Sequence, residues 1–235
     1  MERLKNMFRK RKENESTSLE CVVHSHRPDS DQPVIKTADD AILAKLSTSQ
    51  YGYYDDPFLP HMALHAHGLT SCSKSTQNQT RHQHPIIRKG THARVCVMDR
   101  CITAFVSLKK NQPKQIVILG AGKDTAFLRY QAGLLNAQQN PLNTMDEDIN
   151  SQVQWYEIDH PSVIQSKKNL IDTMPSITDS KNLSSLHLVP FDLRSSPHTL
   201  FDLLVEQFSF SLNAPTLFVL ECVQMYLPGE KIFIY

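Results

Sequence analysis

Four positions in the second half of the chain carry residue types that suit ligand chemistry, and each follows a short apolar segment. These are Gly120, Asp159, Asp192 and Glu221. A glycine after an apolar segment lets the backbone approach a ligand, and a following helix offers free N–H groups. A carboxylate at the end of such a segment, as at Asp159, can accept ribose hydroxyls. Asp192, beside the backbone N–H of Leu193, can read the amino edge of adenine. Together the four positions predict an adenosine pocket, for which S-adenosylmethionine is the obvious ligand.

Each position also has an ordinary structural interpretation. The Gly-Ala-Gly turn at 120–122 could be a tight turn, and Asp159 could cap a helix that opens at Pro161. Asp192 could be a loop residue, and Glu221 a solvent-facing acid. The dinucleotide fingerprint needs a third glycine, but Thr125 stands in that place, which argues against an NAD-dependent oxidoreductase.

The elements that must position these residues follow an α/β pattern. Short, largely apolar and β-branched segments alternate with helical segments, which predicts a parallel sheet with helices on both faces and ligand sites at its carboxyl edge. We therefore expect a Rossmann-like open sheet. The expected strands are 115–119, 153–158, 186–189 and 216–221, with 231–235 as a candidate fifth, and the expected helices are 124–137, 161–173 and 199–208.

The first half of the chain predicts helices without strands. Thr37 is expected to cap a helix that ends before Gly52, with acidic residues in its first turn. Apolar residues at 3–4 spacing predict a second helix at 91–105. Segments 68–83 and 138–152 are polar and are expected to be loops. We predict a disordered basic and polar tail at 1–32, a helical cap at 33–112 and an α/β domain at 113–235.

Composition narrows the functional class. Of 235 residues, 25 are Lys or Arg and 24 are Asp or Glu, so the formal net charge of +1 gives no general attraction to nucleic acid or membrane. No apolar segment approaches the ~20 residues of a membrane span. Five cysteines without a Cys-x-x-Cys pair indicate free thiols in a reducing compartment. The basic cluster in residues 3–12 could serve nuclear import or phosphate binding, but disorder is favoured.

A group of histidines has the residue types of a metal site. His61 and His65 have the i, i+4 spacing of zinc ligands on a helix, and His67, His82 and His84 follow. A His-Glu-x-x-His glutamate and a nearby cysteine pair are both missing from the sequence. We therefore predict no metal.

Residues 34–235 resemble the leucine carboxyl methyltransferase family. The matching segments occur in the order and spacing of the family, and the combination of LGAGxDT, ExDxP and ECVxxY is specific to it. These segments are VIKTADDAILAKLS (34–47), YGYYDDPF (51–58), IIRKGTHARV (86–95), QIVILGAGKDTAFLRY (115–130), WYEIDHPSVIQSKK (155–168), FDLR (191–194) and LFVLECVQMYL (217–227).

The resemblance implies roles for individual residues. It implies that a Lys and an Arg bind the methionine carboxylate of S-adenosylmethionine, as a point charge and a fork. It also implies a glycine beside the cofactor, a ribose ligand, two adenine contacts and an acid at the methionine end. The pair that binds the carboxylate is Lys45 and Arg94, and the glycine beside the cofactor is Gly120. The ribose ligand is Asp159, the adenine contacts are Asp192 and Leu193, and the acid at the methionine end is Glu221.

The sequence departs from the family pattern in three places. Arg88-Lys89-Gly90 stands where Asn-Arg-Gly is usual, Lys123 follows the glycine turn, and Gln224 replaces an aliphatic residue. The family's C-terminal segment is absent, so we expect the last strands to be missing and stability and turnover to suffer more than cofactor binding.

The implied reaction is methylation of the C-terminal leucine carboxylate of the protein phosphatase 2A catalytic subunit, by a monomer in the cytoplasm and also the nucleus. Arg88, Lys89 or Tyr226 could steer the substrate carboxylate. Two alternatives share the cofactor motifs: methylation of a carboxyl side chain on a wybutosine-type tRNA base, and an inactive form that binds cofactor or phosphatase. Action on tRNA predicts a basic face, and the net charge of +1 argues against it.

Overall fold

The computed structural model describes residues 28–64, 66, 83–108, 112–136, 153–174 and 183–227. The described residues from Gln32 onward belong to one compact unit. The basic cluster, the 138–152 loop, nearly all of the 68–83 loop and the candidate strand 231–235 lie outside the described residues. The predicted domain boundaries therefore stay predictions.

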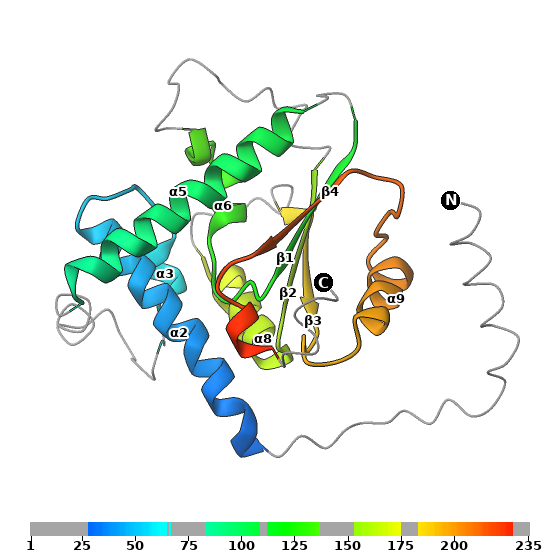
Figure 1. The fold of residues 1–235 in the computed structure, drawn as a ribbon, viewed down its shortest axis with the longest axis horizontal. Coiled ribbons are helices and arrows are strands. Elements are labelled where there is room, and N and C mark those ends of the chain that lie inside the picture. Colours follow the sequence, from blue (N-terminus) through cyan, green and yellow to red (C-terminus); the bar gives the residue numbers. More distant parts are fainter. Residues whose placement is uncertain are drawn as a thin grey trace, which may run out of the picture. The chain divides into compact units, whose positions relative to one another are not determined.

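The described part of the chain contains one parallel sheet of four strands (Figure 1). Its order is β3-β2-β1-β4, so the chain winds outward from β1 in one direction and then returns to the other side of it. This arrangement confirms the predicted α/β, Rossmann-like fold. The strands are β1 (Lys114–Leu119), β2 (Val153–Asp159), β3 (Leu186–Pro190) and β4 (Thr216–Leu220).

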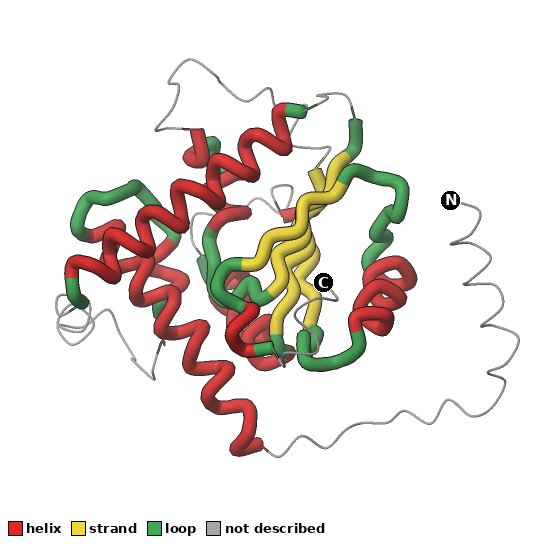
Figure 2. Tube along the Cα trace, viewed as in Figure 1, coloured by secondary structure: helices red, strands yellow, loops and turns green. Residues whose placement is uncertain are grey.

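Helices cover both faces of the sheet (Figure 2). Figure 1 shows α9 on one side of the strands, whereas α2, α5 and α6 lie on the other. The longer helices are α2 (Pro28–Gln50), α5 (Pro85–Ser107), α8 (Pro161–Asp172) and α9 (Pro197–Gln207). The short ones are α3 (Leu59–Met62), α6 (Ala126–Gln131), η2 (Leu134–Asn136) and η4 (Gln224–Tyr226).

The two faces of the sheet bury two separate cores. All six residues of β1 are buried, which explains why its sequence is largely apolar without strict alternation. Ile116 and Ile118 point into the core shared with α2, α5 and α6. Val117 and Leu119 point into the other core, against α9. Successive side chains of a strand face opposite sides, so both faces must be apolar.

Two predicted helix starts are wrong. Helix α2 begins at Pro28, so Thr37 lies inside it and does not cap it. Helix α5 begins at Pro85, because a proline suits the first helical position and the side chain of His84 accepts a hydrogen bond from the Ile86 N–H.

The predicted helix 124–137 is much shorter in the structure. Helix α6 ends at Gln131, and Gly133 follows with φ +70°. That backbone conformation suits glycine and ends helices. A 3-10 turn, η2, then completes the segment.

The strand register brings the functional positions to one edge. Leu119, the last residue of β1, pairs with Ile158 of β2 and Leu220 of β4, and Asp159 pairs with Pro190 of β3. The loops that follow all four strands therefore start side by side. Among the described residues, no helix is both long and apolar enough to cross a membrane.

Candidate functional site

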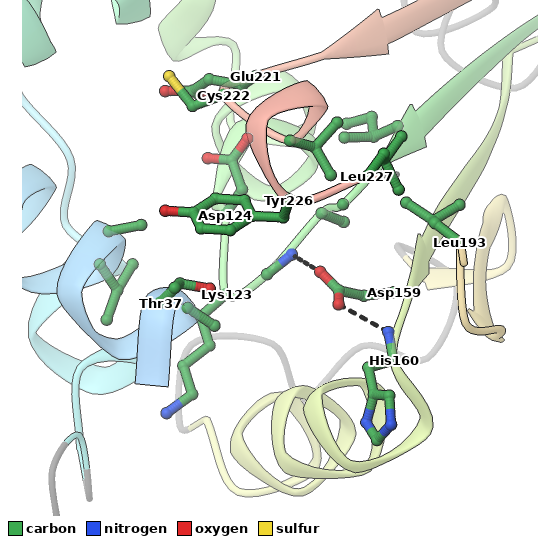
Figure 3. Close-up of a pocket in the computed structure, with 18 of the residues that line it drawn as sticks. Thr37, Lys123, Asp124, Asp159, His160, Leu193, Glu221, Cys222, Tyr226 and Leu227 are labelled. Carbon is green, nitrogen blue, oxygen red and sulfur yellow. Dashed lines mark hydrogen bonds between the residues drawn. The ribbon is translucent and has the colours of Figure 1, made fainter. Parts of the chain in front are cut away.

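A pocket lies where the carboxyl ends of the strands meet helices α2 and α5 (Figure 3). The strand order reverses at this edge, between β1 and β4, which is where open α/β sheets bind ligands. The structure brings all seven predicted cofactor residues into the pocket lining. These are Lys45, Arg94, Gly120, Asp159, Asp192, Leu193 and Glu221.

Close approach between two loops explains the glycine at position 120. Gly120 has φ +75°, and a Cβ atom there would lie 2.5 Å from Cγ2 of Val223 in the loop after β4. The Gly120 and Ala121 N–H groups donate to the Ile158 carbonyl at 2.8 and 3.1 Å. The glycine therefore permits the loops after β1 and β4 to pack together at the pocket wall.

Asp159 holds the glycine turn through its carboxylate. Its Oδ2 accepts from the Gly122 N–H and its Oδ1 from the His160 N–H, both at 2.6 Å (Figure 3, dashed lines). Burial raises the pKa of Asp159, and the two backbone N–H groups only partly offset this. The cap of α8 is His160, whose Nδ1 accepts from Ser162 N, so the interpretation of Asp159 as the cap is wrong. Each carboxylate oxygen retains a further lone pair for a ligand hydroxyl.

Four charged side chains alternate in sign along one wall of the pocket. Lys45 Nζ lies 3.0 Å from Asp124 Oδ1 and 2.8 Å from Glu221 Oε2, and Arg94 Nε lies 3.3 Å from Glu221 Oε1. The side chains of Lys45, Asp124 and Glu221 are 8%, 12% and 15% exposed, and Arg94 is 44% exposed. We call these four residues the charge cluster.

Electrostatics favours the charged forms of Lys45 and Asp124 in the charge cluster. Burial alone would lower the pKa of Lys45, but the Asp124 and Glu221 carboxylates overcome it and hold that pKa above its usual value. Burial would raise the pKa of Asp124, but Lys45, Arg129 and Lys167 hold it below its usual value. Sequence reasoning did not single out Asp124, although it is the acid of the LGAGxDT segment.

Asp192 and Leu193 form the opposite side of the pocket. The Asp192 carboxylate accepts from Arg194, through Nε at 2.9 Å and Nη2 at 2.7 Å, and also from the Arg194 backbone N–H at 2.9 Å. Burial alone would raise the pKa of Asp192, but Arg194 holds that pKa below its usual value. Arg194 was not predicted as a site residue, although it closes the quoted FDLR segment.

Comparison with known proteins decides the family. The family described as leucine carboxyl methyltransferase matches residues 34–233. The chain belongs to this family. It is 29% identical to leucine carboxyl methyltransferase 1 of Aspergillus fumigatus over 70% of this chain and 40% of the relative. It is 27% identical to the Schizosaccharomyces pombe protein of that name, over 84% and 57%, and 28% identical to that of Bos taurus, over 86% and 56%. The chain spans about half the length of these relatives.

Of the three candidate substrate-steering residues in this leucine carboxyl methyltransferase family member, the structure places only Tyr226 at the pocket. Arg88 lies over the Tyr51 ring, 3.8 Å from its centroid, and its Nη1 donates to the Gln83 carbonyl at 2.5 Å. Lys89 is exposed and also lies outside the pocket lining. Both precede Arg94 by five or six residues, about 8–9 Å along the helix.

His61, a metal-ligand candidate by residue type, makes hydrogen bonds to protein groups. Its Nε2 contacts the Leu170 carbonyl at 2.8 Å and Thr173 Oγ1 at 3.3 Å, so a local hydrogen bond accounts for it. Among the described residues, no group of three or more His, Cys, Asp or Glu side chains could hold a metal. His65, His67 and His82 lie outside the described residues.

Lys123, which departs from the family pattern, ties helix α2 to the glycine turn. Its Nζ lies 2.6 Å from Asp39 Oδ1, and the side chains are only 6% and 14% exposed. We expect Lys123→Met to lower the free energy of unfolding by about 1–3 kcal/mol, because it removes a charge-assisted hydrogen bond between two largely buried side chains. Thermal unfolding, with the exposed Lys168→Met as control, measures this change. An unchanged Tm for Lys123→Met would show that the pair does not hold the helix.

A second buried network, behind the glycine turn, predicts a pH dependence. Asp56 Oδ2 accepts from Thr125 Oγ1 at 2.6 Å and lies 3.3 Å from Arg129 Nε. Burial raises the pKa of Asp56 to about 6, although Thr125 and Arg129 oppose it. The folded state therefore binds a proton more readily than the unfolded state, so Asp56 contributes less stability as pH rises from about 4 to 6.

We expect Asp56→Asn to remove this contribution, which is at most about 1.4 kcal/mol per pH unit. Denaturant unfolding of the parent and the variant at pH 4.5 and 6.5 measures how the free energy of unfolding of each protein changes with pH. If the free energy of unfolding changed equally with pH in both proteins, the pH dependence would not come from Asp56.

Proposed function

We propose that this chain transfers the methyl group of S-adenosylmethionine to the C-terminal leucine carboxylate of a protein, and that the protein is the phosphatase 2A catalytic subunit. The observation that carries the proposal is the charge cluster beside the glycine turn, in one pocket at the switch point of the sheet. Family membership and the names of the relatives support the reaction class.

The residues present fit S-adenosylmethionine. Its methionine end carries one carboxylate and one ammonium group, which suits a wall with two cations and two anions. Lys45 and Arg94 would bind the carboxylate, and Glu221 and Asp124 the ammonium. Asp159 would accept the ribose hydroxyls, and Asp192 with Leu193 would contact adenine. Gly120, without a Cβ, permits the loop after β4 to pack against the glycine turn at the wall of this pocket.

The bound cofactor supplies an electrophilic methyl group on a sulfonium centre. A C-terminal carboxylate has a pKa of ~3.5 and is already ionised at neutral pH, so the protein needs no general base. The work of the chain is then to orient the carboxylate and to exclude water from it. Tyr226 is our candidate for the first task, because it lines the pocket and is 48% exposed. Met98, Val223 and Leu227 provide apolar lining for the second.

None of the three described cysteines, Cys96, Cys101 and Cys222, is in a disulfide bond. Free thiols are typical of reducing compartments and support the cytoplasm, with the nucleus as a second location, as the site of the reaction.

Methyl-labelled S-adenosylmethionine tests the proposal. We would incubate the chain with the phosphatase 2A catalytic subunit, intact and lacking its final leucine, and count base-labile label. We expect label on the intact protein only, since a methyl ester is base-labile and the truncated subunit has lost the leucine. Equal label on both proteins, or none on either, would contradict the proposed substrate.

A further inference from the structure

A buried lysine beneath the pocket has no part in the cofactor contacts proposed above. Lys167, on helix α8, has a side chain that is 1% exposed. Its Nζ lies 2.6 Å from Glu157 Oε2 on β2 and donates to the backbone carbonyl of Asp124 at 2.7 Å. Glu157 is itself 0% exposed. Burying such a pair carries a large desolvation cost, and an apolar pair of similar volume is often equally stable, so stability alone does not explain why the pair is present.

The contact that distinguishes this pair is the one to Asp124. The Asp124 side chain faces the pocket, where its Oδ1 lies 3.0 Å from Lys45 Nζ and also accepts from the Thr125 N–H at 2.7 Å. The Asp124 carbonyl faces away, toward Lys167. One residue is therefore fixed from two sides, by Lys45 through its carboxylate and by Lys167 through its backbone.

The position of Lys167 in the fold couples three elements at this point. Helix α8 presents the ammonium group, β2 supplies the compensating carboxylate through Glu157, and the loop after β1 supplies the carbonyl. The loop is also held by Asp159 through Gly122 N. Asp159 fixes the first half of the loop and Lys167 the second, so the direction of the Asp124 carboxylate depends on Lys167.

We propose that Lys167 is a positioning residue for cofactor binding, acting through the backbone of Asp124 to set the charge cluster. This inference rests on the proposed function. Its neighbour Lys168 offers a matched control on the same helix, because it is 55% exposed and pairs only with Asp172 at 2.6 Å among the contacts that we find for it.

Three variants separate positioning from stability. Lys167→Met leaves Glu157 as an uncompensated buried charge, so we expect a lower Tm and weaker binding of S-adenosylhomocysteine. Glu157→Gln/Lys167→Met removes both charges, so most of the lost Tm should return. The double variant still lacks the donor to the Asp124 carbonyl, so its Kd should stay at least about ten-fold above that of the parent. Lys168→Met should match the parent in both measurements.

Thermal unfolding and isothermal titration with S-adenosylhomocysteine give the two readouts. A double variant whose Tm and Kd both return to those of the parent would overturn the positioning role and leave only a structural ion pair. Parental affinity in Lys167→Met would overturn it as well. A parent chain that does not bind S-adenosylhomocysteine at all would instead overturn the proposed function, and this inference with it.

Discussion

Lys45→Met is expected to weaken the binding of S-adenosylhomocysteine by about 100-fold, or roughly 2.7 kcal/mol. Lys45 is the only group within 3.0 Å of both Asp124 and Glu221 among the described contacts. Removing it takes away a cation for the ligand carboxylate and leaves two buried carboxylates facing that ligand. Isothermal titration with the parent and the variant measures the loss.

A second ligand makes the Lys45 test specific. 5′-Methylthioadenosine keeps the adenosine part but lacks the amino-acid group, so its affinity should change much less in Lys45→Met. Lys36→Met is the control variant, because Lys36 is exposed on the same helix. Equal losses for both ligands would place the effect in the fold and would contradict a direct role of Lys45 at the methionine end.

Gly120→Ala is expected to lower the free energy of unfolding by about 2–4 kcal/mol. An alanine must adopt φ +75° there, and its Cβ would lie 2.5 Å from Val223 Cγ2 and 2.9 Å from Val223 Cβ. The second of these atoms is attached to the backbone and cannot rotate away. Relief requires the loop after β4 to shift, and this loop also carries Glu221, so S-adenosylhomocysteine binding should fall as well.

Gly90 provides the matched control for this substitution. It lies inside helix α5, its φ is ordinary, and a Cβ atom at this position would have no neighbour within 4 Å. Alanine is favoured over glycine in a helix by up to about 1 kcal/mol, so Gly90→Ala should raise the Tm slightly. Denaturant unfolding compares the two variants. A Gly120→Ala variant as stable as the parent would show that the two loops do not pack as the structure has them.

The sequence predicted the sheet well, because buried parallel strands have a strong local signature. The β-branched and apolar segments before Gly120, Asp159 and Asp192 each became a strand with bounds within a residue or two of those expected. The topology of such sheets then places the strand ends at one edge, so the location of Gly120, Asp159, Asp192 and Glu221 at that edge could be predicted without any view of the tertiary structure.

The helix starts were harder to predict, because capping signals compete. Thr37 resembles an N-cap, yet α2 continues through it from Pro28. The start of α5 has a local signal in Pro85, a proline at the first helical position, but the apolar spacing further along the chain predicts a start at residue 91.

The pairings within the site could not be predicted, because they join residues far apart in the sequence. Lys45 and Glu221 are 176 positions apart, and Lys167 and Asp124 are 43 apart, so no local pattern links them. Asp124 and Arg194 stood in quoted segments and needed the fold to show their partners. Arg88 was a candidate by its position in a motif, but helical geometry places it away from the pocket, with its guanidinium over the ring of a tyrosine.

Titration of the parent chain with S-adenosylmethionine is the most direct test of the pocket. We predict one binding site per chain, with a Kd no weaker than the range of about 1 μM to 1 mM that is usual for enzyme substrates. Affinity should fall in Lys45→Met and stay unchanged in Lys36→Met. A parent chain that shows no binding, or that binds NAD as tightly as S-adenosylmethionine, would contradict the assignment of this pocket to the methyl donor.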